Sequence, residues 1–268
     1  MLGGRHGLQY IDQRRFVEAT ETAFVPLFKA DEVNDVVREA FFIARSESRP
    51  VFLNVPRDVQ EEEYDDDPAD YEPSTAMHPG PQRTMPNPER LREAARMLAN
   101  SEKPVIVVGS GARGAAESAI KELADRVGAL LASSLPMKGW GNDSPYYAGV
   151  AGLYATRTGL ELFADADCVL GVGASLNRHT LADGYVFPNA NYIQIDLRPS
   201  LLMGNHRAAD VYLQGDARLT VEALNDLLQN DGVSGKTGYR TVEVKGMLKE
   251  WDPDPREFEL EPATVDPR

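Results

Sequence analysis

Disulfide bonds within the chain are excluded, because its 268 residues include a single cysteine, Cys168. The thiol stands in an apolar run, residues 168–172, and this setting is typical of a buried structural cysteine rather than a nucleophile. No apolar stretch approaches the roughly 20 residues that span a bilayer. The amino terminus does not resemble a signal peptide. We therefore expect a cytoplasmic protein without a membrane span.

Positive charge is scarce as well. Lysine and arginine number 28 against 42 aspartate and glutamate residues, which gives a formal net charge of −14. Nucleic acid and anionic membranes are therefore poor partners. No P-loop and no G-x-S-x-G motif is present. The histidines lack the spacing of metal ligands, so we assign no metal site; they are His6, His78, His179 and His206.

Residues 89–230 alternate between helical periodicity and short apolar runs. Helices are predicted around residues 91–98, 120–127 and 224–228, and strands at residues 105–108, 129–132, 168–172 and 192–195. Continuous apolar strands separated by amphipathic helices are typical of a parallel sheet with helices on both faces. The predicted fold class is therefore α/β, a doubly wound, Rossmann-like parallel sheet.

The amino-terminal part, residues 1–58, is predicted to be a partial second α/β module. Its helix has apolar residues on one face from residue 33 to residue 44, and a short strand follows at residues 51–55. A pair this small cannot bury its own apolar face. We therefore expect exposed apolar area at Val33, Val36, Val37, Phe41 and Phe52.

Two segments of different composition flank the central domain. Residues 59–88 combine an acidic run with six prolines, which favours an extended linker. Residues 231–268 are again polar and rich in proline. The sequence therefore predicts linkers at 59–88 and 231–268 around a central domain at 89–230.

A glycine-rich turn follows the first strand of the central domain. Residues 109–114 fit G-x-G-x-x-G, a pattern whose glycines let the backbone approach a pyrophosphate at the start of a helix. A nicotinamide site also needs an acidic residue after the next strand, and residues 130–135 contain none. A tight strand–helix turn needs glycine in any case. The residues alone thus indicate a nucleotide-type fold without an assigned ligand.

Six segments, in order along the central domain, resemble the acetolactate synthase-like family of thiamine-diphosphate-dependent enzymes. They are residues 103–111, 135–139, 147–152, 166–174, 193–199 and 215–217. The flanks agree with this resemblance. Residues 8–13 and 49–58 resemble the last part of the family's pyrimidine-binding domain, and residues 263–268 resemble the approach to its diphosphate-binding domain. The chain is thus expected to cover only the middle of a longer family member.

The resemblance implies a parent enzyme in which thiamine diphosphate attacks a 2-oxo acid and carbon dioxide is lost, followed by carboligation or protonation. Such a parent would be a homodimer or homotetramer with bound magnesium. The family's activating glutamate has no counterpart here. Gly215-Asp216-Ala217 is not the family's magnesium-binding G-D-G motif, because residues 241–245 occupy the place of its asparagine. We therefore assign no catalytic residue and expect the chain alone to be inactive and to bind neither cofactor.

The resemblance also implies a set of cofactor-binding positions, and some family members hold FAD in the central domain. Tyr154 and Ala155 replace the usual histidine–glycine pair, and a β-carbon at a close-approach glycine tends to exclude a ligand. We expect an empty or repurposed domain with weak nucleotide binding, and FAD is the alternative. A non-catalytic nucleotide-binding or assembly module is the alternative to an enzyme fragment. The cofactor-binding positions are Gln9, Gly109, Gly111, Gly152, Gly173 and Asp196.

Overall fold

A computed structural model describes residues 11–64, 71–78, 80, 82–114, 117–198 and 208–249. The chain divides into two compact units, residues 1–82 and residues 83–268. Within the described ranges, no helix is long and apolar enough to cross a membrane.

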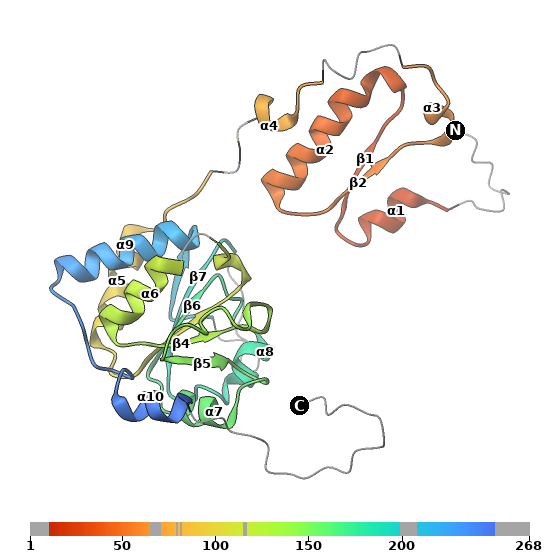
Figure 1. The fold of residues 1–268 in the computed structure, drawn as a ribbon. Coiled ribbons are helices and arrows are strands. Elements are labelled where there is room, and N and C mark those ends of the chain that lie inside the picture. Colours follow the sequence, from red (N-terminus) through yellow and green to blue (C-terminus); the bar gives the residue numbers. More distant parts are fainter. Residues whose placement is uncertain are drawn as a thin grey trace, which may run out of the picture. The chain divides into compact units, whose positions relative to one another are not determined.

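The second unit is built on a six-stranded sheet in the order β5-β4-β3-β6-β7-β8 (Figure 1). Every pair of neighbouring strands is parallel. The predicted α/β class with a parallel sheet is confirmed. The strands are β3 (Pro104–Val108), β4 (Leu130–Ser133), β5 (Tyr147–Val150), β6 (Cys168–Val172), β7 (Asn191–Asp196) and β8 (Val211–Gln214).

Helices cover both faces of this sheet, because alternate residues of each strand point to opposite sides. Ile106 and Leu170 join one apolar cluster with α5 (Pro88–Asn100), α6 (Glu117–Val127) and α9 (Ala217–Asn230). Val105 and Val169 join a second cluster with α7 (Arg157–Ala164), α8 (Arg178–Leu181) and α10 (Val242–Lys249). Short 3₁₀ turns lie at Ser110–Ala112, Leu135–Met137 and Ala182–Gly184.

Helix α5 shows how local sequence sets the elements. The Asn87 side chain accepts hydrogen bonds from the N–H groups of Glu89 (2.8 Å) and Arg90 (3.3 Å), and Pro88 occupies the first turn. Both features are typical of helix starts. The buried face carries Leu91, Ala94, Ala95 and Leu98, the periodicity that the sequence predicted.

The two edge strands, β5 and β8, were not predicted. In each, buried residues alternate with partly exposed or exposed ones, whereas β3 and β6 are buried throughout. An edge strand therefore lacks the continuous apolar run that identifies a central strand.

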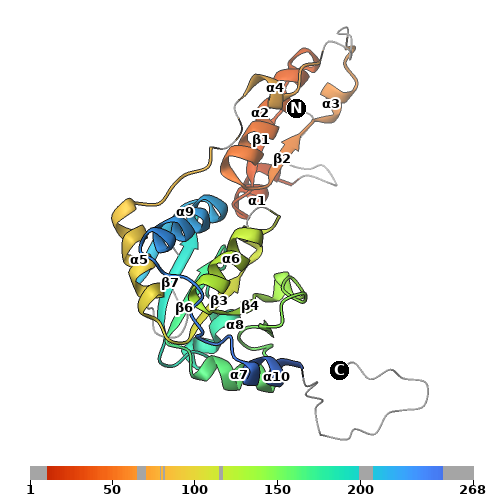
Figure 2. The ribbon, with the colours of Figure 1, turned by 60° about the vertical axis from the view of Figure 1, so that its left-hand side comes forward.

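Residues 236–249 pack against the rest of the second unit, although the sequence assigned them to a linker. The Lys236 Nζ donates to Ala99 O (2.6 Å) and to Ser101 O, carbonyls at the end of α5. Buried Tyr239 donates its hydroxyl to Leu162 O in α7 and its N–H to Gly128 O. We call residues 236–240 the strap; α10 follows it and lies beside α7 (Figure 2).

The first unit is a small β-α-β arrangement. Strands β1 (Ala23–Pro26) and β2 (Val51–Asn54) pair in parallel, and α2 (Val33–Glu47) connects them. The predicted helix and strand are present, and Phe41 and Phe52 are exposed as predicted. Val33, Val36 and Val37 are partly buried instead. The unit also contains α1 (Gln13–Glu18), a 3₁₀ turn (Ala30–Glu32), α3 (Arg57–Gln60) and α4 (Ser74–Met77).

Part of the predicted linker at 59–88 packs on α2. The Arg38 Nε donates to Glu72 O (2.7 Å), and Arg45 donates to Ser74 O (3.1 Å) from the same helix. The rings of Phe42 and His78 are 4.8 Å apart. The polar composition of this segment does not predict the packing, because two of these contacts are hydrogen bonds to backbone carbonyls.

Candidate functional site

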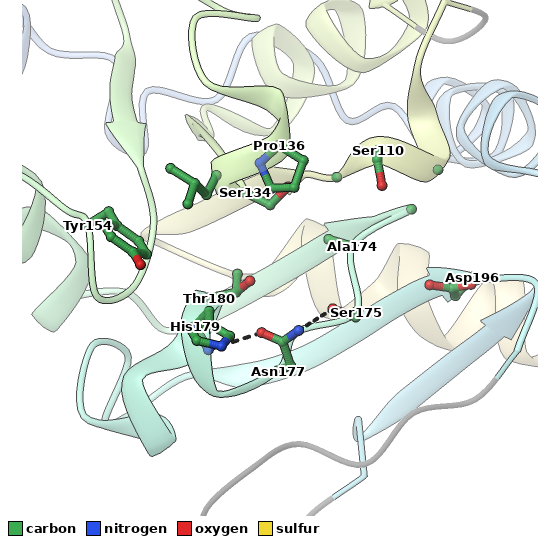
Figure 3. A pocket seen from close by; sticks show the side chains of 14 residues that line it. Ser110, Ser134, Pro136, Tyr154, Ala174, Ser175, Asn177, His179, Thr180 and Asp196 are labelled. Atoms are coloured by element: carbon green, nitrogen blue, oxygen red, sulfur yellow. Dashed lines mark hydrogen bonds between the residues drawn. The ribbon is translucent and has the colours of Figure 1, made fainter. Parts of the chain in front are cut away.

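A cleft of about 510 Å³ opens in the second unit (Figure 3). From β3 the chain first adds β4 and β5 on one side and then crosses to add β6, β7 and β8 on the other. In open α/β sheets, ligands bind beyond the carboxyl ends of the strands at such a switch point. The lining includes residues that directly follow β3, β4 and β6: Gly109, Ser110, Gly111, Ser134, Leu135, Pro136, Tyr154, Gly173, Ala174, Ser175, Asn177, His179, Thr180 and Asp196.

Three of the predicted glycines lie at the centre of this edge, in contact with one another. Gly111 N–H donates to Gly173 O (3.0 Å), and Gly109 N–H donates to Val172 O (2.9 Å). A β-carbon on Gly109 would lie 2.2 Å from Gly173 O, and one on Gly111 would lie 2.9 Å from Gly173 Cα. These glycines are therefore required because the loops after β3 and β6 touch.

Gly152 serves a similar contact outside the cleft lining. Its φ of +89° lies in the left-handed region, and a β-carbon there would lie 1.9 Å from His179 O. Leu153 N–H donates to the same carbonyl at 3.0 Å. The contact joins the loop that carries Tyr154 to the helix that carries His179, and both side chains line the cleft.

The sequence did not anticipate the polar residues after β6. Asn177 accepts a hydrogen bond from His179 N–H (3.0 Å) as the cap of α8, and its Nδ2 donates to Ser175 Oγ (2.9 Å). The sequence assigns His179 to no metal site, because the histidines lack the spacing of metal ligands. An asparagine two residues before a histidine is a helix-cap signal that could have placed this turn.

Asp196 ends β7 and contributes the one carboxylate among the described lining residues. Its Oδ1 accepts a hydrogen bond from Arg198 N–H at 3.3 Å, and its carbonyl accepts one from the Tyr212 hydroxyl at 3.0 Å. Burial, and then the charge of Asp196, raise the pKa of Tyr212 to about 12. Tyr212 is therefore a neutral donor that holds the end of β7.

Residues 91–224 match the family described as "Thiamine pyrophosphate enzyme, central domain". The chain is 32% identical over 206 residues to a probable acetolactate synthase large subunit of Methanocaldococcus jannaschii, covering 75% of this chain and 34% of that protein. The chain belongs to the acetolactate synthase-like family of thiamine-diphosphate-dependent enzymes. The family predicted from the sequence is thereby confirmed.

Two further relatives in this thiamine-diphosphate enzyme family carry other names. The probable 2-ketoarginine decarboxylase AruI of Pseudomonas aeruginosa is 32% identical over 220 residues, which is 81% of this chain and 38% of that protein. The glyoxylate carboligase of Escherichia coli O157:H7 is 28% identical over 257 residues, 93% of this chain and 41% of that protein. The chain therefore spans about two fifths or less of the length of these relatives.

The description of this family implies thiamine diphosphate as the cofactor of its intact members. Gln9, the predicted contact to that cofactor, lies outside the described residues. Asp216, which the sequence excludes from the magnesium-binding motif, caps α9 by accepting Leu219 N–H at 3.0 Å. Across the described ranges, no cluster of three or more His, Cys, Asp or Glu residues could hold a metal ion.

The three glycines of the cleft offer no free N–H group to the diphosphate of a flavin dinucleotide. A bound diphosphate needs free N–H donors or cations. The N–H groups of Gly109, Gly111 and Gly173 already donate to backbone carbonyls. The described residues that line the cleft include no lysine or arginine. The nearby Arg113 is not part of the lining and donates to Pro136 O at 3.3 Å.

Cys168 is buried in β6, so its interpretation as a structural thiol is confirmed. Burial raises its pKa to about 12, with smaller contributions from Asp167 and Asp210. A neutral, buried thiol cannot act as a nucleophile at physiological pH.

Proposed function

We propose that this chain is the central portion of a thiamine-diphosphate-dependent enzyme that decarboxylates or ligates 2-oxo acids. The observation that carries the proposal is the family match over residues 91–224, together with relatives named for such reactions. The fold supports it, because a parallel sheet with a cleft at its switch point suits a central nucleotide-type domain. The intact parent is proposed to be a cytoplasmic homodimer or homotetramer.

We further propose that these 268 residues alone are inactive. The chain has no counterpart of the glutamate that activates the cofactor in this family, and residues 241–245 replace the asparagine of the magnesium motif. The position of Asp216 as a helix cap supports this proposal, since its Oδ1 is engaged by Leu219 N–H and its Oδ2 lies 3.7 Å from Arg83 Nε.

Titration calorimetry of the purified chain with thiamine diphosphate and magnesium tests the inactive state. The expected result is no heat of binding, and a micromolar dissociation constant would contradict the proposal.

The parent activity is tested by sequencing the DNA on both sides for the glutamate and the G-D-G motif. The extended protein is then assayed for carbon dioxide release from glyoxylate and 2-ketoarginine. Failure to extend the reading frame would favour a separate module.

The second candidate is a non-catalytic nucleotide-binding module. It is favoured by the second unit's own closed core, which the strap completes through Lys236 and Tyr239. In this proposal the cleft residues predicted from the sequence, Gly109, Gly111, Gly173 and Asp196, mark the nucleotide site, and Gly152 shapes its wall. Weak nucleotide binding without cofactor turnover is the expected outcome.

A further inference from the structure

The middle of the cleft is unsuited to anions. Its glycine turn is closed by Gly111 N–H bonding to Gly173 O, and the helix after this turn, α6, has Glu117 in its first turn. An acidic residue there opposes the attraction that a helix amino end offers to phosphate. Asp196 adds a further negative charge to the lining. A diphosphate would therefore find no glycine N–H donor and no lysine or arginine among the described lining residues, and one end of the cleft carries the charge of Asp196.

The two ends of the cleft offer different chemistry. Tyr154 lies at one end and Asp196 at the other, with Ser134 and Pro136 on the opposite wall from Asn177 and His179 (Figure 3). The Tyr154 side chain is 55% exposed and is free to cover a planar ring. The carboxylate of Asp196 only accepts hydrogen bonds, which suits the hydroxyl groups of a ribose. Between them the described wall residues include no carboxylate, lysine or arginine.

We propose that the cleft takes a nucleoside without a diphosphate, with its ring toward Tyr154 and its ribose hydroxyls on Asp196. This inference rests on the proposed nucleotide site and narrows its ligand. The predicted glycines then act as a chain-to-chain contact that shapes the cleft, and the selective contacts come from Tyr154 and Asp196. The alternative ligand, FAD, is disfavoured by its diphosphate.

The experiment compares adenosine, 2′-deoxyadenosine, ADP and FAD as probes of the whole 268-residue chain, by ligand-observed NMR titration. Adenosine is expected to bind roughly tenfold more tightly than ADP or FAD. A tenfold difference in affinity is about the size expected for one hydrogen bond to a charged group. 2′-Deoxyadenosine is expected to bind several-fold more weakly than adenosine. Asp196→Asn should reduce this preference and improve the relative affinity for ADP.

Asp226→Asn is the matched control, because it removes the same charge from an exposed position on α9. It should leave all four affinities unchanged, and a thermal melt of each variant verifies folding. ADP or FAD binding more tightly than adenosine would overturn the inference and leave the nucleotide site standing. No binding by any probe would overturn both, and equal effects of the two variants would overturn the role of Asp196.

Discussion

The glycine turn is a contact between two loops, and Gly111 tests that description. In Gly111→Ala the new β-carbon would lie 2.9 Å from the Gly173 backbone, which cannot rotate away as a side chain can. We expect a loss of about 1–3 kcal/mol in the free energy of unfolding, as for other overpacked sites. Urea unfolding monitored by circular dichroism measures it.

Gly246→Ala supplies the control for that substitution, since no atom lies within 4 Å of the added carbon in α10. It should be neutral or stabilise the protein by about 0.5–1 kcal/mol, because alanine favours a helix interior. Equal stability of the two variants would show that the loops separate easily.

Burial of Cys168 gives a pH dependence. The pKa of the folded thiol is raised to about 12 from an ordinary 9.0, so the native state holds this proton more tightly than the unfolded state. Stability from this group is complete below pH 9 and is lost as pH rises toward 12, by at most about 1.4 kcal/mol per pH unit. Urea unfolding between pH 8 and 11 should show the decline, and Cys168→Ala should flatten it. An unchanged slope would mean that the thiol does not contribute.

At the residue scale, the sequence identified the glycines of the site but not their role. A pattern such as G-x-G-x-x-G reports a backbone without side chains, and both a ligand and a neighbouring loop produce it. The partner loop after β6 is more than 50 residues away along the chain, so only the fold reveals that Gly173 closes on Gly111. The turn that carries His179 has a local signal, the Asn177 cap, but its position in the cleft depends on the fold.

Among the elements, the strap was the least predictable, because polar residues make its contacts. Lys236→Met should cost about 1–2 kcal/mol of unfolding free energy, since two carbonyls at the end of α5 lose a charged donor. Chemical denaturation measures the change. Lys249→Met, at an exposed position in α10, is the matched control and should change stability by less than about 0.5 kcal/mol. A similar result for both lysines would contradict the strap's role.

The first unit exposes aromatic rings on short elements. Phe16 and Phe28 are 65% and 66% exposed, and Phe16 lines an apolar hollow of about 410 Å³ with Ile11 and Phe52. Apolar area of this kind favours association, so we expect the dimer fraction to rise with concentration. Phe16→Ser should weaken association in sedimentation velocity, whereas Tyr185→Ser, an 85% exposed aromatic in the second unit, should not.

Hydrogen exchange on dilute protein tests whether the first unit needs this association for its stability. If residues 33–55 are strongly protected in a demonstrated monomer, the unit is self-contained and the association is not needed for its stability.

For the molecule as a whole, the sequence was sufficient for the class of the larger unit and the central strands. Continuous apolar runs such as β3 and β6 can be recognised as strands from the sequence alone. The alternating edge strands and the strap cannot, because their positions depend on contacts with residues distant in sequence.

Limited proteolysis tests the proposed division at residues 59–88. The boundary between the two compact units falls between residues 82 and 83 of the chain. The first cuts should therefore fall within residues 59–88 and leave a resistant fragment whose amino terminus lies in this range. Mass spectrometry should also find residues 236–249 retained in this fragment, because the strap is bonded to α5 and α7. Early cleavage within β3 or β6 would contradict the assignment.

The strap also sets an order of events during protein synthesis. Lys236 donates hydrogen bonds to carbonyls of residues that are synthesised 137 and 135 positions before it. Arg240 donates to a carbonyl 111 positions before it. At about 5–20 residues per second, these groups wait roughly 6 to 27 seconds in a nascent chain for their donors. Through that interval the carbonyls at the end of α5 and just before β4 lack these donors, so we expect the unit to be most accessible to chaperones before the strap and α10 emerge.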